Sequence, residues 1–226
     1  GRGQAITVTG FITWFLVTAE ILPFTAATCI GVSVVCAVGC GVLYHFQGKN
    51  GIDCFPSGKV NLIYGEEILF FIFFLMWTYF AGFRPQAYGT EKFMDYGFME
   101  AMMRSTTLPA RDLWYSEGTI NYYYGGQYFA VFLTKLTGSK VELTYNLMRT
   151  FVAAFAFVLP FSLVRQMSVD RLKGSLTGKK RCLPAVAGII AGLSVSIAGN
   201  MHYVVYSKII PWIQKLQGRE VDSYWF

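Results

Sequence analysis

The stretch from Glu67 to Phe83 reads EILFFIFFLMWTYFAGF, and it decides the class of fold. After its first residue it carries no charge, and as a helix it is long enough to cross roughly 30 Å of hydrocarbon. Four more runs of similar character are expected to cross a membrane, at residues 5–22, 24–46, 145–164 and 183–206. The pattern therefore predicts an all-α, polytopic transmembrane helical bundle of about five spans.

The composition agrees with this prediction and argues against a soluble protein. Of the 226 residues, 54% are hydrophobic and 14% are charged, whereas an ordinary soluble domain carries about 25% charged residues. The formal net charge is +6, but most of it lies in one short segment, so we expect no nucleic-acid partner. That segment is residues 165–182, with one acid and six bases: Asp170 against Arg165, Arg171, Lys173, Lys179, Lys180 and Arg181.

The basic segment sets the expected orientation. Positive charge between two spans is typical of a cytoplasmic loop, although such a segment could also bind lipid head groups. With residues 165–182 in the cytoplasm, alternation of the spans places the N-terminus in the cytoplasm and residues 84–143 outside, as one 60-residue loop. Within that loop, residues 126–137 are too short to span and are expected to form an interfacial helix. We expect a single membrane domain that is a piece of a longer protein.

Small residues and cysteines in the apolar runs indicate packing rather than chemistry. Gly188 and Gly192 form a small-xxx-small pattern, which is typical of helices that pack closely within one chain. The five cysteines and the two histidines, His45 and His202, show no spacing typical of a zinc site. The cysteine positions indicate no disulfide framework.

The external loop holds two acids that could carry chemistry. Residues 91–104 are expected to form a helix, and Glu91 and Asp95 lie four residues apart on one face of it. At the boundary between water and lipid, such a pair could act as a general base, hold a divalent metal ion or accept hydrogen bonds from sugar hydroxyls. The alternative is a solvated helix face on which these acids pair with Lys92 or Arg104.

Aromatic and polar residues further along the loop suggest a carbohydrate surface. Flat aromatic rings near acids suit sugar rings, but tyrosines at this depth are also typical of the aromatic belt of a membrane protein. Arg149, inside the fourth span, matches a phosphate in geometry, unless it only snorkels to the interface. The residues of the candidate sugar surface are Asp112, Trp114, Asn121, Tyr122, Tyr123 and Tyr124.

Three motifs in the loop resemble one known family. They are Gly89-Thr90-Glu91-Lys92-Phe93-Met94-Asp95, Pro109 with Asp112-Leu113-Trp114, and Asn121-Tyr122-Tyr123-Tyr124-Gly125. In this order, and followed by Tyr145-Asn146-Leu147, they resemble the YYY membrane-protein family of uncharacterised multi-span proteins from archaea and bacteria. The resemblance covers essentially the whole chain and departs from the family at Ala110, where a second proline is usual. It implies a protein of a prokaryotic plasma membrane and, because family members are much longer, that this chain is the N-terminal part of a longer protein.

That family is similar, more loosely, to the GT-C membrane glycosyltransferases, and this similarity implies roles for the loop residues. Asp95 would deprotonate or position the acceptor, and Glu91 would assist it or bind a metal. Arg149, Arg104 or Lys92 would hold the phosphate of a polyprenyl-phosphate-linked sugar. The candidate sugar surface would bind substrate, and no cofactor other than a divalent metal is suggested.

We therefore expect a membrane glycosyltransferase that moves a sugar from a lipid-phosphate donor to an external acceptor glycan or protein. Its partners would be membrane lipid, the donor and the acceptor. Two other classes stay open from the sequence: a transporter or lipid flippase with the loop as its gate, and a non-catalytic glycan-binding membrane protein.

Overall fold

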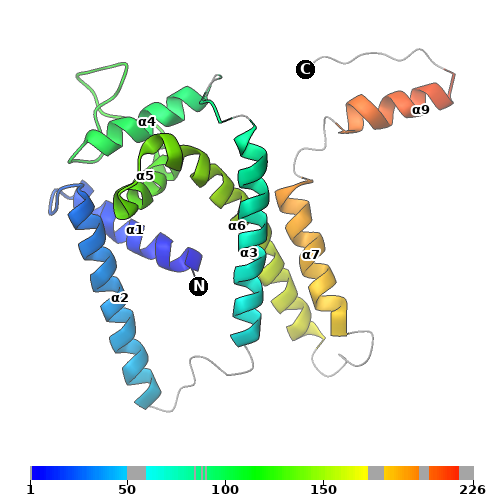
Figure 1. The fold of residues 1–226 in the computed structure, drawn as a ribbon, viewed down its shortest axis with the longest axis horizontal. Coiled ribbons are helices and arrows are strands. Elements are labelled where there is room, and N and C mark those ends of the chain that lie inside the picture. The colour runs from blue at the N-terminus through cyan, green and yellow to red at the C-terminus, as the bar shows by residue number, and fades with distance from the viewer. Residues whose placement is uncertain are drawn as a thin grey trace. The chain divides into compact units, whose positions relative to one another are not determined.

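The elements of the chain are helices. A computed structural model describes residues 2–49, 60–83, 85–87, 89, 91–172, 181–198 and 204–218, and within these ranges it contains no strand, only an isolated bridge between Arg111 and Thr119. The helices are α1 (Arg2–Thr18), α2 (Ala26–Lys49), α3 (Val60–Gly82), α4 (Lys92–Arg104), α5 (Gly125–Thr137), α6 (Val141–Arg171), α7 (Leu183–Ser196), the π-helix η3 (Val205–Ile209) and α9 (Ile210–Leu216) (Figure 1). The chain divides into two compact units, Gly1–Phe155 and Ala156–Phe226.

Three helices are long and apolar enough to cross a membrane by length and composition: Ala26–Phe46, Val60–Gly82 and Val141–Arg171. Two shorter apolar helices, Gly3–Thr18 and Leu183–Ser196, coincide with the first and last expected spans. The expected all-α membrane fold is confirmed. The crossings by residues 5–22 and 183–206 stay predictions, because α1 ends at Thr18 and residues 199–203 lie outside the described part. Most of the basic segment, residues 173–180, also lies outside it.

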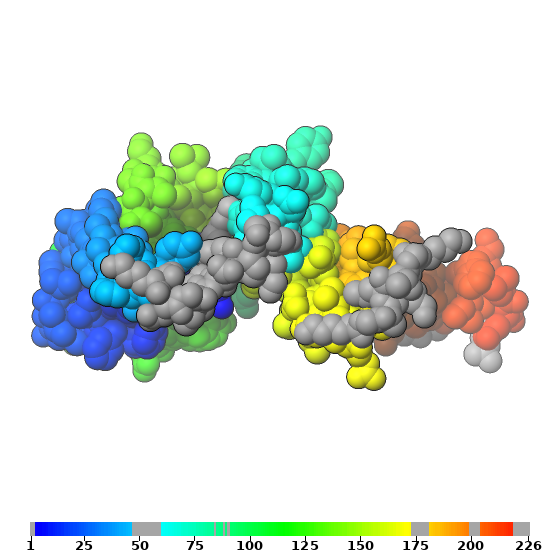
Figure 2. All heavy atoms as spheres, turned by 90° about the horizontal axis from the view of Figure 1, so that it is seen from below, coloured from blue at the N-terminus to red at the C-terminus, as the bar shows by residue number. Residues whose placement is uncertain are grey.

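The membrane helices of the first unit bury few of their own side chains. In the 23 residues of α3, Phe70 is the buried residue, while Leu75 is 61% exposed. Atoms of α2 and α3 are accordingly visible at the surface of the molecule (Figure 2). Apolar side chains that contact no protein must contact lipid, so these helices present their sides to the bilayer.

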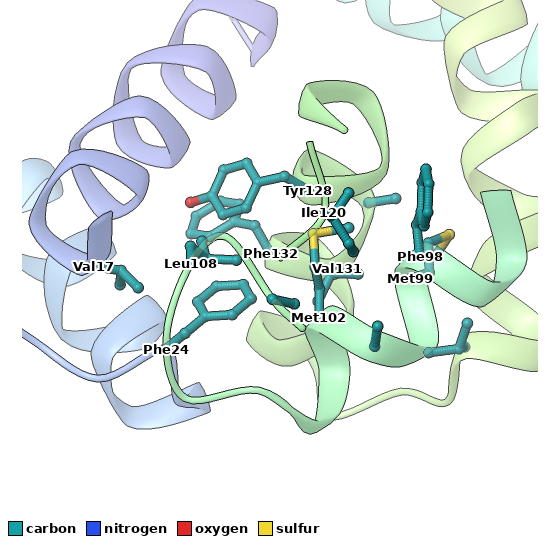
Figure 3. Packing of buried hydrophobic residues seen from close by; sticks show 14 of the residues in the cluster. Val17, Phe24, Phe98, Met99, Met102, Leu108, Ile120, Tyr128, Val131 and Phe132 are labelled. Atoms are coloured by element: carbon teal, nitrogen blue, oxygen red, sulfur yellow. The ribbon is translucent and has the colours of Figure 1, made fainter. Parts of the chain in front are cut away.

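The chain between α3 and α6 folds into a compact cap at one end of α2 and α3 (Figure 1). We use the word cap for residues 91–140, in which α4 packs on α5. The apolar side of α4, which could have lain on the membrane surface, packs into the protein core instead: Phe98, Met99 and Met102 are buried. The largest fully buried side chains of this core include Phe24, Met102, Ile120, Tyr128, Val131 and Phe132 (Figure 3).

The turn between α1 and α2 is part of the cap core. Phe24 is fully buried there, its ring lies 5.6 Å from that of Tyr128, and its backbone N–H donates to the carbonyl of Thr106 at 2.7 Å. The turn and the cap therefore lie on the same side of the membrane helices. That this side is the outer face of the membrane stays a prediction from the sequence.

In the second unit, α7 packs closely on the last part of α6. A Cβ atom at Gly188 would lie 2.8 Å from the carbonyl oxygen of Phe161, and one at Gly192 would lie 2.8 Å from the ring of Phe157. Any larger residue would push the two helices apart, so the two glycines serve close helix packing within the chain, as expected.

Candidate functional site

The first turn of α4 presents the two candidate carboxylates. Glu91 is the residue before the helix, and the backbone N–H of Asp95 donates to its carbonyl at 2.9 Å. Asp95 lies in the first turn, where the helix dipole favours a negative charge. Its Oδ1 accepts a hydrogen bond of 2.7 Å from Nε2 of Gln127. Gln127, on the first turn of α5, thus fixes the orientation of a half-buried Asp95 carboxylate.

Among the described residues, the alternative of a solvated helix face fits Glu91, whose side chain is exposed, but the expected charge pairing is not seen. There, neither Glu91 nor Asp95 forms an ion pair with Lys92 or Arg104. Asp95 instead has a neutral amide partner, so its charge stays available to a ligand. Sequence reasoning missed Gln127, because nothing in its local pattern distinguishes it from a solvated residue.

Lys92 and Arg149 line one hollow at the end of α3. The hollow has a volume of about 560 Å³ and is open to the outside. Its wall is largely apolar, and its two charged members come from the start of α4 and the third turn of α6. The lining residues are Trp77, Phe80, Ala81, Phe83, Lys92, Arg149, Thr150 and Ala153.

The side chain of Arg149 is oriented toward the start of α6. Its guanidinium lies 5.8 Å from the ring of Tyr145, a cation–π contact, and its Nη1 donates to Oδ1 of Asn146 at 3.1 Å. Asn146 in turn donates to the carbonyl of Pro85 at 2.8 Å, which ties the segment after α3 to α6. Arg149 therefore reaches toward the cap, as snorkelling requires, and its charge lines the hollow.

Neither cation of this hollow forms an ion pair with a carboxylate in the part of the chain that the structure describes. The indole N–H of Trp77 is also buried there without a hydrogen-bond partner among those residues. An unpaired buried donor costs about 1–3 kcal/mol. An oxygen-rich anionic ligand would supply acceptors to the two cations, Lys92 and Arg149.

Arg104 does not share this hollow. It lies at the other end of the 13-residue α4, which places it about 18 Å along the helix axis from Lys92. Arg104 lines a second hollow, of about 400 Å³, together with Arg111. The structure thus brings two of the three candidate phosphate-binding cations together and places the third elsewhere.

Asp112 shapes the loop that follows α4. Its Oδ1 accepts hydrogen bonds from the backbone N–H groups of Trp114 at 2.8 Å and Tyr115 at 3.0 Å. This is an Asx turn, in which an aspartate replaces a backbone acceptor. Sugar binding by Asp112 stays a prediction, because its Oδ1 already accepts the two hydrogen bonds that hold the loop.

The tyrosine triplet divides between the surface and the interior. Tyr122 and Tyr123 are exposed, with ring centroids 3.9 Å apart, and Asn121 beside them is also exposed. Tyr124 is half-buried, and its hydroxyl accepts a hydrogen bond of 3.1 Å from the indole of Trp14. Two tyrosines therefore face outward, while the third ties the cap to α1.

Tyr123 lies within electrostatic range of the two carboxylates. A hydrogen bond with the Tyr122 hydroxyl raises the pKa of Tyr123 to about 12, and the charges of Glu91 and Asp95 act in the same direction. Trp114 is 60% exposed, and its ring packs edge-on against Phe93 and Phe98 of α4. We call Trp114, Tyr122 and Tyr123 the aromatic ledge.

A buried lysine anchors the cap to the turn between α1 and α2. Nζ of Lys135 donates to the carbonyls of Phe24 and Met103, both at 2.9 Å, and lies 4.5 Å from the centroid of the Phe24 ring. Burial lowers the pKa of Lys135. Sequence reasoning missed this residue; a lysine inside the apolar run 126–137 was the available signal.

No group of three histidines, cysteines or acids lies close enough to hold a metal ion within the described ranges. Glu91 and Asp95 remain a pair of carboxylates one helical turn apart, and a metal between them stays a prediction.

These features define a helical, multi-pass membrane protein whose cap carries carboxylates, cations and exposed aromatic rings. The family profile of an uncharacterized membrane protein, DUF2298, matches residues 8–226, and the chain belongs to this family. No curated protein and no solved structure matches it significantly. The expectation of membership in an uncharacterised family of membrane proteins is thereby confirmed.

Proposed function

We propose that the protein is a membrane glycosyltransferase with a GT-C-like arrangement, acting at the outer face of a prokaryotic plasma membrane with its N-terminus in the cytoplasm. It transfers a sugar from a polyprenyl-phosphate-linked donor to an external acceptor glycan or protein. The observation that carries the proposal is the hollow at the end of α3, which is lined by Lys92 and Arg149 together with apolar side chains.

The hollow suits a phosphate attached to a long hydrocarbon chain. Lys92 and Arg149 supply two positive charges that no carboxylate of the described residues neutralises, and charge-assisted hydrogen bonds to phosphate are strong. Phe80 and Phe83 offer apolar surface to the hydrocarbon. The hollow lies at the end of a membrane helix, the depth at which a lipid phosphate is found.

In this proposal Asp95 acts on the acceptor. It lies three residues from Lys92 on the same helix, hence on a neighbouring part of its surface, and Gln127 holds its carboxylate. In the transfer, the acceptor oxygen bonds to the anomeric carbon of the donor sugar as its proton moves to Asp95. The bond from that carbon to the phosphate oxygen breaks, its electron pair leaves with the phosphate, and Lys92 and Arg149 stabilise the resulting charge.

One observation favours a second candidate, a glycan-binding membrane protein without catalysis. The aromatic ledge is exposed beside Glu91 and Asp95, and it could bind sugar rings whether or not transfer follows. The two candidates differ in what Asp95 does, because a binding protein needs no general base.

The donor site is tested in the full-length protein in its own membrane. Lys92→Gln with Arg149→Gln should lower product glycan at least about tenfold and raise the lipid-linked sugar, because the leaving phosphate loses both cations. Both species are measured by mass spectrometry at matched expression. Arg171→Gln, at the opposite end of α6, is the matched control and should change neither. Unchanged glycan and lipid-linked sugar in the double variant would contradict the proposal.

A further inference from the structure

The second hollow, at the C-terminal end of α4, is a polar site that has no role in the proposed binding of the donor. Two arginines from different elements line it, Arg104 from the last turn of the helix and Arg111 from the loop that follows. Hydroxyl-bearing residues lie between them in the chain and line the same space. The lining residues used here are Arg104, Ser105, Thr106, Thr107, Arg111 and Asp112.

The charge of this hollow is positive. In the described residues, neither Arg104 nor Arg111 forms an ion pair. Asp112 is the acid of the lining, and its Oδ1 is taken by the backbone N–H groups of Trp114 and Tyr115. Two guanidinium groups against one carboxylate leave a net charge that favours an anion.

The turn that carries the hydroxyl groups is held by hydrogen bonds. Oγ of Ser105 donates to the carbonyl of Thr107 at 2.6 Å and accepts from the N–H of Thr107 at 3.2 Å. This bonding holds the 105–107 turn, and the N–H of Phe24 fixes the carbonyl of Thr106. The hollow is therefore built on a backbone that is tied to the buried core.

A structural role accounts for only one of the two arginines. A cation in the last turn of a helix is favourable because of the helix dipole, which explains Arg104 alone. Arg111 lies in the loop after α4, where its backbone forms an isolated bridge with Thr119. It therefore gains nothing from the dipole of α4. Both side chains are exposed and line one hollow without a carboxylate partner among the described residues, an arrangement that suits an anionic ligand.

The surroundings point to a glycan as the carrier of the anion. Leu113 lines the hollow, and the exposed Trp114 follows it and packs on Phe93 and Phe98 along α4. Phe98 also contacts Tyr122, with ring centroids 6.3 Å apart. The aromatic ledge thus joins the hollow to Tyr123 and the carboxylates, and aromatic faces suit sugar rings.

We propose that this hollow binds an anionic substituent, a carboxylate, sulfate or phosphate, on a sugar of the acceptor glycan. The inference rests on the proposed function in that it names the bound glycan as the acceptor. The glycan lies along the aromatic ledge, with its reacting end at Asp95 and its anionic sugar between Arg104 and Arg111. The length of α4, about 18 Å, separates the anionic sugar from the donor phosphate by several sugar units.

Binding of charged and neutral oligosaccharides tests this inference without requiring turnover. The full-length protein in phosphatidylcholine nanodiscs is titrated with labelled tetragalacturonate and, separately, with tetragalactose. We expect tighter binding of the uronate, and a loss of about tenfold or more in Arg104→Gln with Arg111→Gln, because two charge-assisted contacts are removed. Arg104→Lys with Arg111→Lys keeps both positive charges and should retain most of the preference for the uronate over the neutral oligosaccharide. Lys140→Gln, an exposed lysine of the cap, is the matched control and should bind like the wild type.

Three results would overturn the inference: equal wild-type affinity for the two probes, unchanged uronate binding in the double glutamine variant, or loss of uronate binding when phosphatidylglycerol is added to the nanodisc. The last would mean that a lipid headgroup fills the hollow. Failure here is distinguishable from failure of the proposed transferase. If Lys92→Gln with Arg149→Gln abolishes product glycan while uronate binding is absent, only this inference fails. The reverse pattern removes the transferase, and with it the role of the glycan as acceptor, and leaves the anion site as a glycan-binding site.

Discussion

The cap and the membrane helix α3 use apolar residues in opposite ways. Six of the 13 residues of α5 are buried, whereas Phe70 is the buried residue among the 23 of α3. Yet α3 is the more apolar segment, which is why its sequence is recognised first. In this protein, high hydropathy marks surface offered to lipid, and the protein core is built by the less apolar helices that pack on one another.

The largest expected effect comes from a substitution that creates a cavity in the core of the cap. Phe132→Ala should lower the free energy of unfolding by about 3–5 kcal/mol, because Phe132 is 1% exposed and packs in the cap core. Thermal unfolding in nanodiscs, followed by circular dichroism, measures the change. Leu75→Ala, at a side chain of α3 that is 61% exposed, is the control and should cost far less. Equal losses would mean that the cap is no better packed than the membrane helices.

The next largest effect should come from the buried cation. Lys135→Met should cost about 2–3 kcal/mol, because the carbonyls of Phe24 and Met103 lose the donor that satisfies them. The same unfolding measurement applies, with the exposed Lys140→Met as its control. A variant as stable as the wild type would show that the lysine does not hold the α1–α2 turn in the cap.

A smaller effect, with a defined pH dependence, is expected at Tyr128. Its hydroxyl donates to the carbonyl of Gly10 at 2.8 Å, and Tyr128→Phe should cost about 1 kcal/mol at neutral pH. Burial raises the pKa of Tyr128 above its ordinary value of 10.0. Above pH 10 the unfolded wild type ionises while the folded form stays protonated, so the stability of the wild type falls with rising pH.

The phenylalanine variant lacks this ionisation, so the difference between the two proteins should shrink as the pH rises above 10. Unfolding midpoints measured in a pH series between 8 and 11 check the sign. A difference that grows over this range would contradict the burial of the Tyr128 hydroxyl.

The smallest expected effect separates the tyrosines of the triplet. Tyr124→Phe should cost about 0.5–1 kcal/mol, because the indole of Trp14 loses its acceptor. Tyr122→Phe, at an exposed ring, should leave stability unchanged and act only on glycan binding. The same loss of stability in both variants would remove the distinction between outward and inward tyrosines.

Local sequence patterns predicted the individual helices well. Residues 126–137 were expected to form a helix and do so as Gly125–Thr137, and the helix expected over 91–104 is Lys92–Arg104. Such features depend on neighbours within one or two turns, which a single sequence displays. The partners of these helices could not be predicted in the same way.

The unpredicted features are contacts between residues far apart in the chain. Lys135 bonds to Phe24 across 111 residues, and Gln127 bonds to Asp95 across 32. That Arg104 and Arg149 line different hollows likewise depends on the position of α4 relative to α6. Hydropathy does not predict these contacts, because an apolar helix face has the same sequence pattern whether lipid or protein covers it.

The role of Asp95 is tested most directly in the full-length protein in its own membrane. Asp95→Asn keeps the shape of the side chain and removes the base, and Glu117→Gln, at an exposed acid of the same loop, is the control. Surface glycans and lipid-linked sugars are compared by mass spectrometry at matched expression. We predict that Asp95→Asn abolishes one glycan and accumulates its lipid-linked precursor, while Glu117→Gln matches the wild type. An unchanged profile in Asp95→Asn would contradict the transferase.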